Sequence, residues 1–145
     1  MKKSVLFIVS GLILVGLVIQ LAHYGHDHIN PIVNNEPQWD SPKTRALAQR
    51  ACFDCHSNQT VWPWYSNIAP VSWLIYSDVT MGRAHINFSD WDRPDEQHVD
   101  EFQKVFDEDS MPPQEYLLLH PTARLSLEEK KKLFDGLAKL AESYK

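Results

Sequence analysis

Cys52-Phe53-Asp54-Cys55-His56 contains both cysteines of the chain, three positions apart, and a histidine directly follows the second cysteine. Upstream, Ser41 and Pro42 predict a helix start, because serine caps helix N-termini and proline fits the first helical position. We therefore expect a helix from Lys43 to about Cys55. Its C-terminal end would present the two thiols one helical turn apart.

The spacing C-x-x-C-H is the attachment sequence of c-type haem. Two thiols one turn apart can each add to one vinyl group of the same haem, and the adjoining imidazole can then bind the iron. A thioredoxin-like dithiol would need a setting of alternating strands and helices, and a zinc site would need further ligands at finger-like spacing. The motif predicts one covalent haem c, with Cys52 and Cys55 as attachment points and His56 as an iron ligand.

An apolar run from Val5 to Ala22 follows the pair Lys2-Lys3. The run is long enough for one membrane-spanning helix. Cleavage as a signal peptide is the alternative, but it would require a shorter apolar region and small residues where this chain has Gln20. We expect an uncleaved anchor over residues 1–22, with the lysines in the cytoplasm and the remaining chain on the periplasmic side of the inner membrane.

Residues 23–38 form a predicted linker, which two prolines keep from being helical. It contains His23, His26 and His28, and histidines so close together can bind a transition metal. No fourth ligand of defined spacing accompanies them, so a polar linker is the favoured interpretation. The folded domain is predicted to cover residues 39–145.

The composition is typical of a folded protein, with 43% hydrophobic, 23% charged and 11% aromatic residues. Its 145 residues suffice for one small domain. The net charge is −5, and the chain after the anchor is more acidic still, because the positive charges of Lys2 and Lys3 lie outside it. Nucleic-acid binding needs clustered lysine and arginine, so we expect none here.

Helical periodicity recurs along the domain, and no strand alternation is visible. A second helix is predicted from Pro70 to about Gly82, and a third starts between residues 92 and 94 and ends before 107. Ser126 and Glu129 form a capping box for a last helix. The apolar faces expected to be buried are Val71, Leu74, Ile75 and Val79 in the second helix, and Leu133, Phe134, Leu137, Leu140 and Ala141 in the last.

Long loops separate these helices, notably residues 58–70 and 107–113. A domain of this size buries barely enough surface for stability, so long loops imply an added staple. A prosthetic group would supply it. The prediction is an all-α fold of about four helices and long loops wrapped around one covalent haem.

Met111 is the candidate for the second iron ligand, because it precedes Pro112 and Pro113 in a rigid loop C-terminal to the motif. Methionine and histidine are both common haem ligands. Met81 and His85 are therefore alternatives, four residues apart on one face of the predicted second helix. An ordinary loop methionine is the other interpretation of Met111.

Aromatic side chains and arginines complete the candidate site. The aromatic residues are expected mainly to pack, some of them against the porphyrin. Arginines near a haem can pair with its propionates, although solvated arginines are more common. The residues in question are Trp62, Trp64, Tyr65, Trp73 and Trp91, and Arg83 and Arg124.

Residues 39–140 resemble the bacterial haem-binding domain family of small monohaem c-type cytochromes, which is similar to class I cytochrome c. The resemblance implies that Cys52 and Cys55 form the thioethers, that His56 is the proximal ligand and that Met111 is the distal ligand. An insert over about residues 58–91 departs from a minimal class I cytochrome. The matching segments are Trp62-Pro63-Trp64-Tyr65, Ala69-Pro70-Val71-Ser72-Trp73, Gly82-Arg83, Asn87-Phe88-Ser89 and Leu118-Leu119-His120-Pro121.

Electron transfer is the expected function, since a haem with two protein ligands has no open site and is suited to outer-sphere redox chemistry. The partners would be redox proteins, which the sequence does not identify. The protein is accordingly expected not to be an enzyme. The alternatives are a ligand sensor or small peroxidase with an open or displaceable sixth position, and a binding module that uses haem only as a staple.

Overall fold

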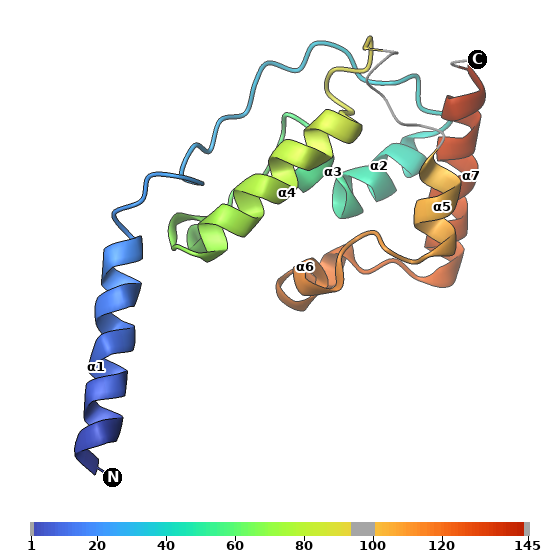
Figure 1. The fold of residues 1–145 in the computed structure, drawn as a ribbon. Coiled ribbons are helices and arrows are strands. Elements are labelled where there is room, and N and C mark those ends of the chain that lie inside the picture. The colour runs from blue at the N-terminus through green and yellow to red at the C-terminus, as the bar shows by residue number, and fades with distance from the viewer. Residues whose placement is uncertain (1, 94–100, 144–145) are drawn as a thin grey trace. The chain divides into compact units, whose positions relative to one another are not determined.

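The described residues, 2–93 and 101–143, contain helices and no strand in a computed structural model of the chain (Figure 1). This confirms the predicted all-α class. An isolated bridge pairs Asn35 with Asp90. The helices are α1 (Lys2–Ile19), α2 (Pro42–Ala51), α3 (Phe53–His56), α4 (Val71–His85), α5 (Phe102–Asp107), α6 (Gln114–Leu119) and α7 (Leu127–Ser143), with 3-10 turns η1 (Trp64–Asn67) and η4 (Pro121–Ala123).

The helices differ from the prediction in three places. The first predicted helix is divided into α2 and α3, because Cys52 leaves helical geometry at φ −126°. Of the predicted third helix, residues 94–100 lie outside the described part of the chain, and α5 is its described portion. The short helix α6, directly after Pro113, was not predicted.

The chain divides into two compact units, which are described separately. One contains residues up to 29 together with 62–78, and the other contains 30–61 and the residues from 79 onward. Helix α4 begins in the first unit and ends in the second.

The larger unit is built on the contact between α2 and α7 (Figure 1). Leu133, Leu137 and Leu140 of α7 are buried, as the periodicity predicts. Helix α7 comes close to α2 at Gly136, where an added Cβ would lie 2.4 Å from Cγ2 of the buried Thr44. The core cluster consists of Leu47, Ala48, Ala51, Phe53, Ile86, Phe88, Trp91, Phe102, Leu125, Leu133, Leu137 and Leu140.

Both predicted helix caps are present in the structure. The Ser41 hydroxyl accepts a hydrogen bond from the Thr44 amide at 3.2 Å, which satisfies one of the free amides at the start of α2. Ser126 and Glu129 bind each other's amides at 3.3 and 2.9 Å, which is the reciprocal pattern of a capping box. The sequence therefore places these two helix starts correctly.

Residues 30–38 are non-helical, as predicted, and hydrogen bonds attach them to the larger unit. The Asn58 side chain donates to the Ile32 carbonyl at 2.8 Å, and the Asn34 amide donates to the Ser89 carbonyl at 2.9 Å. Arg45 of α2 binds both carboxylate oxygens of Glu36 at 2.6 Å. These contacts give the segment fixed partners in addition to its role as a connection.

The Glu36–Arg45 pair predicts a loss of stability in acid. Hydrogen bonds from Arg45, and then from Trp39, hold the pKa of Glu36 below its ordinary 4.5. A carboxyl with a lowered folded-state pKa stabilises the fold above its unfolded pKa, and this contribution disappears as the pH falls through the folded-state pKa. The pair is partly exposed, so we expect at most about 1 kcal/mol.

Urea denaturation of the Glu36→Gln variant over about pH 3 to 6 tests this expectation. The variant should be less stable than the unsubstituted protein at pH 6, and the difference should disappear in acid. Glu128→Gln, at an exposed position, is the matched control. An equal difference at every pH would contradict the assignment.

The smaller unit contains α1, which is long and apolar enough to cross a membrane. A signal sequence near an N-terminus has the same properties. Residues 23–29 fold back onto residues 62–78 of the same unit. The His28 ring stacks on Trp62 with centroids 4.5 Å apart, and Tyr24 packs edge-on against Tyr76.

Helix α4 shows the largest difference between the expected and the observed burial. Val79 is buried, as predicted, but Val71 and Leu74 of the same predicted face are 41% and 53% exposed. The helix also continues past Gly82, its predicted end, to His85. Gly82 is therefore a glycine within a helix, and its surroundings explain why no larger residue occupies the position.

Candidate functional site

The C-x-x-C-H segment is compact and lies where α2 gives way to α3. Amides of Cys55 and His56 donate to the Cys52 carbonyl at 3.2 and 2.9 Å, which closes one helical turn around the three residues. Neither cysteine is in a disulfide, and both are partly exposed. The hydrogen bonds therefore keep the two cysteines and the histidine within one helical turn.

The His56 ring is oriented by two main-chain carbonyls. Its Nδ1 lies 3.0 Å from the Gly82 oxygen and 3.2 Å from the Ile86 oxygen. A carbonyl only accepts hydrogen bonds, so Nδ1 carries the proton and Nε2 keeps its lone pair. A donor bond of this kind is what fixes a metal-binding histidine in position.

Burial determines the protonation of the site residues. It lowers the pKa of His56, although the bonds to Ile86 and Gly82 act in the opposite direction, so the ring is neutral at neutral pH. Burial, with a smaller effect of Cys55, raises the pKa of the Cys52 thiol to about 12. The site thus presents a neutral imidazole and a protonated thiol.

Gly82 is the point at which α4 touches the motif. A Cβ at this position would lie 2.5 Å from the Cys55 carbonyl oxygen and 3.1 Å from the Cys55 Cβ. Side chains do not occupy such distances, so only glycine permits this approach. The close approach is also what brings the Gly82 carbonyl within hydrogen-bonding distance of His56.

The Gly82→Ala variant should therefore be destabilised by about 1–3 kcal/mol, the usual range for forcing a methyl group into a packed contact. Alanine favours a helix, so propensity alone would predict the opposite sign. Thermal unfolding of the purified protein measures the change. Thr80→Ala, at an exposed position of the same helix, is the control and should change stability little. A Gly82→Ala variant as stable as this control would show that α4 does not pack so closely.

The segment Asn87-Phe88-Ser89 holds the chain that follows the motif. The Phe88 amide donates to the His56 carbonyl at 2.8 Å, and the Ser89 hydroxyl accepts from the Asn58 amide at 3.0 Å. The Asn87 side chain donates to Asn58 at 2.9 Å. These bonds explain why this polar segment is buried, since each polar group has a partner.

Arg83 also contributes to this framework. Its guanidinium donates to the Ser57 carbonyl, the Thr60 hydroxyl and the Asn30 side chain at 2.8, 2.9 and 2.8 Å. The expected pairing with a propionate would compete with these bonds. Arg124, the other candidate, is exposed.

Asp54, between the two cysteines, connects the motif to α6. Its carboxylate accepts from the Tyr116 hydroxyl at 2.7 Å and from the Val61 amide at 3.0 Å. Tyr116 belongs to α6, which begins three residues after Met111. The loop that carries Met111 is thus tied at its C-terminal end to the predicted attachment motif.

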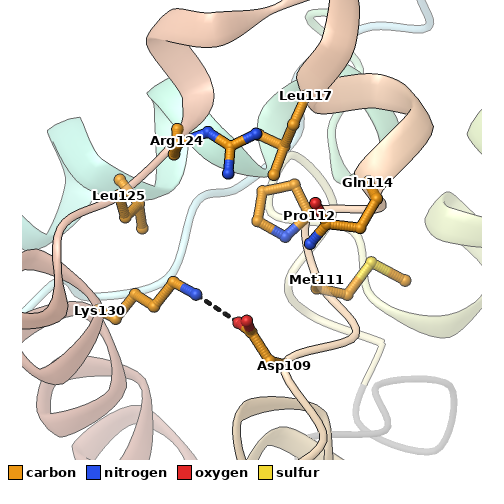
Figure 2. Close-up of a pocket in the computed structure, with 8 residues that line it drawn as sticks. All are labelled: Asp109, Met111, Pro112, Gln114, Leu117, Arg124, Leu125 and Lys130. Atoms are coloured by element: carbon orange, nitrogen blue, oxygen red, sulfur yellow. Dashed lines mark hydrogen bonds and ion pairs between the residues drawn. The ribbon is translucent and has the colours of Figure 1, made fainter.

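Met111 lies beside a small pocket of about 140 Å³ (Figure 2). The pocket is smaller than the roughly 300–1,000 Å³ typical of ligand sites, so it is not itself a cofactor cavity. Figure 2 shows the Met111 side chain directed away from Arg124 and Leu125. The side chain is 45% exposed, so no core packing holds its sulfur in place.

Met81 and His85 lie on the segment of α4 that passes the Nδ1 edge of His56. The Gly82 carbonyl of this helix and the Ile86 carbonyl just after it both lie within hydrogen-bonding distance of Nδ1. The His85 ring also lies 3.0 Å, through its Nδ1, from the Met81 carbonyl. Helix α4 therefore contacts His56 at Nδ1, the nitrogen that a metal bound at Nε2 would leave free for such bonds.

The five predicted aromatic residues differ in burial. Trp91 is buried in the core and stacks on Phe88 at 5.8 Å, whereas Trp64 is 76% exposed. Trp62 and Trp73 belong to the smaller unit, where their indole nitrogens are buried without a hydrogen-bond partner. The core position of Trp91 agrees with the expectation that these aromatic residues mainly pack.

The structure offers no support for a metal site at the linker histidines. Among residues 2–93 and 101–143, no three His, Cys, Asp or Glu side chains are grouped so as to hold a metal ion. His28 instead approaches the Ser66 carbonyl at 3.1 Å. Its contacts are those of a packed residue of the smaller unit.

The chemistry of the donor set fits haem. Two thiols outside any disulfide stand one turn apart, and a neutral imidazole beside them is held through Nδ1. Residues 14–139 match the model of a protein family described as a haem-binding domain. No curated protein and no solved structure matches the chain.

Proposed function

Because the chain belongs to the haem-binding domain family, we propose that it is a membrane-anchored monohaem c-type cytochrome that transfers electrons. The single observation that carries the proposal is the site at Cys52, Cys55 and His56, where two cysteines outside any disulfide adjoin an imidazole that is held through its Nδ1. The remaining steps concern attachment, the second ligand and the membrane.

Cys52 and Cys55 are proposed to bind the haem covalently. Each thiol would add across one vinyl group, with a sulfur–carbon bond formed and the thiol hydrogen placed on the second vinyl carbon, so no oxidant would be needed. His56 would offer Nε2 to the iron, while the Gly82 and Ile86 carbonyls hold the ring through Nδ1.

Met111 is proposed as the distal ligand. Two observations support it: the bond from Tyr116 to Asp54 ties its loop to the motif, and Met81 and His85 lie along the Nδ1 edge of His56. The exposed thioether of Met111 is available to bind the iron because it is not packed in the protein core. Coordination would then order a side chain that the protein alone leaves exposed.

Haem supplies a one-electron couple between ferric and ferrous iron, and ligation by methionine and histidine raises its potential. If His56 and Met111 both bind the iron, no site would remain open to a substrate. The protein then acts as a carrier rather than an enzyme. Its partners would be redox proteins of the same compartment.

Membrane attachment is proposed through α1. The helix exposes only apolar side chains along most of its length, and Lys2 and Lys3 precede the run. Positive residues stay on the cytoplasmic side, so the haem domain would face the periplasm.

Binding of carbon monoxide to the reduced protein tests the proposed function. A carrier with Met111 on the iron should bind the gas slowly, at a rate independent of its concentration, because the methionine must first dissociate. Voltammetry of the same sample should show a reversible one-electron wave. Rapid binding that rises with gas concentration would indicate an open sixth position, and the sensor or peroxidase alternative would then replace the carrier.

A further inference from the structure

The start of α4 and the loop before it expose an apolar edge in the smaller unit. Val71 and Leu74 belong to the face of α4 that was predicted to be buried, but both are exposed at this edge. Trp64, in the turn η1, is the most exposed tryptophan of the described residues at 76%. The apolar edge is formed by Trp64, Ile68, Pro70, Val71 and Leu74.

This part of the sequence is unusual in charge and in aromatic content. Residues 62–77 include no Asp, Glu, Lys, Arg or His, although the chain as a whole is acidic. They do include three tryptophans and two tyrosines. Tryptophan and tyrosine are enriched where membrane proteins cross from lipid to water, because their rings are apolar at one end and polar at the other.

Hydrogen bonds tie this edge to the end of the apolar run. The Gln20 side chain donates to the Ala69 carbonyl at 2.9 Å and accepts from the Ala69 amide at 3.0 Å. Gln20 is one residue beyond α1, and Ala69 lies between Ile68 and Pro70 of the apolar edge. Figure 1 shows the loop before α4 beside the C-terminal end of α1.

Further contacts within the same unit fix this arrangement. Gly25, at φ +81°, passes so close to α4 that a Cβ there would lie 2.7 Å from the Ser72 carbonyl oxygen. His28 contacts the Ser66 carbonyl and stacks on Trp62. The residues after α1 therefore fold onto the loop and hold it at the end of the helix.

We propose that the apolar edge rests in the lipid interface of the membrane that α1 crosses, at the C-terminal end of this helix. The proposal rests on the membrane anchoring in the proposed function and extends it to a second contact with lipid. Anchoring fixes the depth of Gln20, and the bonds to Ala69 then place Ile68 and Val71 at the same depth. The absence of charged side chains from residues 62–77 and the exposed Trp64 fit a position in the lipid interface.

Photolabelling of the full-length haem protein tests this proposal. The protein would be reconstituted in phosphatidylcholine vesicles containing a phosphatidylcholine with a diazirine in its acyl chain, and adducts would be mapped by mass spectrometry. We expect adducts in α1 and in residues 62–77. Trp64→Ser and Leu74→Ser, at exposed positions, should reduce the adducts of residues 62–77 several-fold and leave those of α1 unchanged.

The position of the adducts distinguishes the lipid contact of the apolar edge from the membrane anchoring by α1. Adducts in α1 without adducts in residues 62–77 would overturn the lipid contact and leave the anchor intact. The absence of adducts from both would show that α1 is not in the bilayer, and it would overturn the proposal together with the anchoring. Adducts of residues 62–77 that stay unchanged in both serine variants would also overturn it, because labelling would then not depend on the apolar edge.

Discussion

A double Cys52→Ala/Cys55→Ala variant is expected to contain no covalently attached haem. The chain has no other cysteine, so no thioether can form once both thiols are gone. Haem staining after denaturing electrophoresis, normalised to the amount of polypeptide, measures the loss. We also expect a sharp fall in the yield of folded protein, because a small domain with long loops depends on an added staple.

Single variants make this test quantitative. Cys52→Ala and Cys55→Ala each leave one thiol, so reduced but measurable attachment is expected. Val61→Ala, at an exposed position shortly after the motif, is the control and should retain full haem content. Covalent haem at the unsubstituted level in the double variant would contradict the assignment of both cysteines.

In the Met111→Ala variant, the haem iron is expected to lose its methionine ligand and become five-coordinate. Soft thioether sulfur stabilises ferrous iron, so its loss should lower the reduction potential. The weak far-red band that accompanies methionine ligation of ferric haem should disappear. Carbon monoxide should then bind the reduced variant rapidly, because no protein ligand must leave first. Voltammetry, absorption spectra and flow mixing record these three changes.

Two variants on α4 serve as controls for this prediction. Met81→Ala and His85→Ala should keep the far-red band, because α4 passes His56 on its Nδ1 edge. A high-spin spectrum in the His85→Ala variant alone would indicate two histidine ligands, and the protein would then be a low-potential carrier. A band that survives in Met111→Ala would exclude Met111 directly.

Local signals in the sequence predict much of this fold. Ser41 and the Ser126–Glu129 pair mark helix starts because capping depends on neighbours within one turn. The buried face of α7 follows from its periodicity, since all three of its leucines that meet the core recur at helical spacing. The attachment motif is equally local, which is why the structure keeps Cys52, Cys55 and His56 together.

Contacts between distant segments are what the sequence does not predict. Gly82 was expected near a helix end, but its role depends on Cys55, which approaches from another helix. The bond between Asp54 and Tyr116 joins residues 62 positions apart. The residues that flank Gly82 and Asp54 in the sequence do not indicate which distant residues they contact. A glycine inside an apolar helical pattern is nevertheless a recognised sign of close packing.

The exposure of the first half of α4 could not be predicted for a different reason. Periodicity identified Val71 and Leu74 as apolar residues on one face but could not say what covers that face. The structure attaches this end of α4 to the end of α1 through Gln20 and Ala69. If α1 spans a membrane, as proposed, lipid would cover this face, because the same apolar pattern that predicts a protein core also fits a membrane surface.

The intact mass of the purified, unsubstituted protein after acid-acetone extraction tests the central claim most directly. Non-covalent haem dissolves in the acetone, whereas haem bound to Cys52 and Cys55 through thioethers remains on the polypeptide. The account predicts a coloured polypeptide whose mass exceeds that of the chain by one haem. A colourless polypeptide of unmodified mass, with the haem recovered in the acetone, would contradict it.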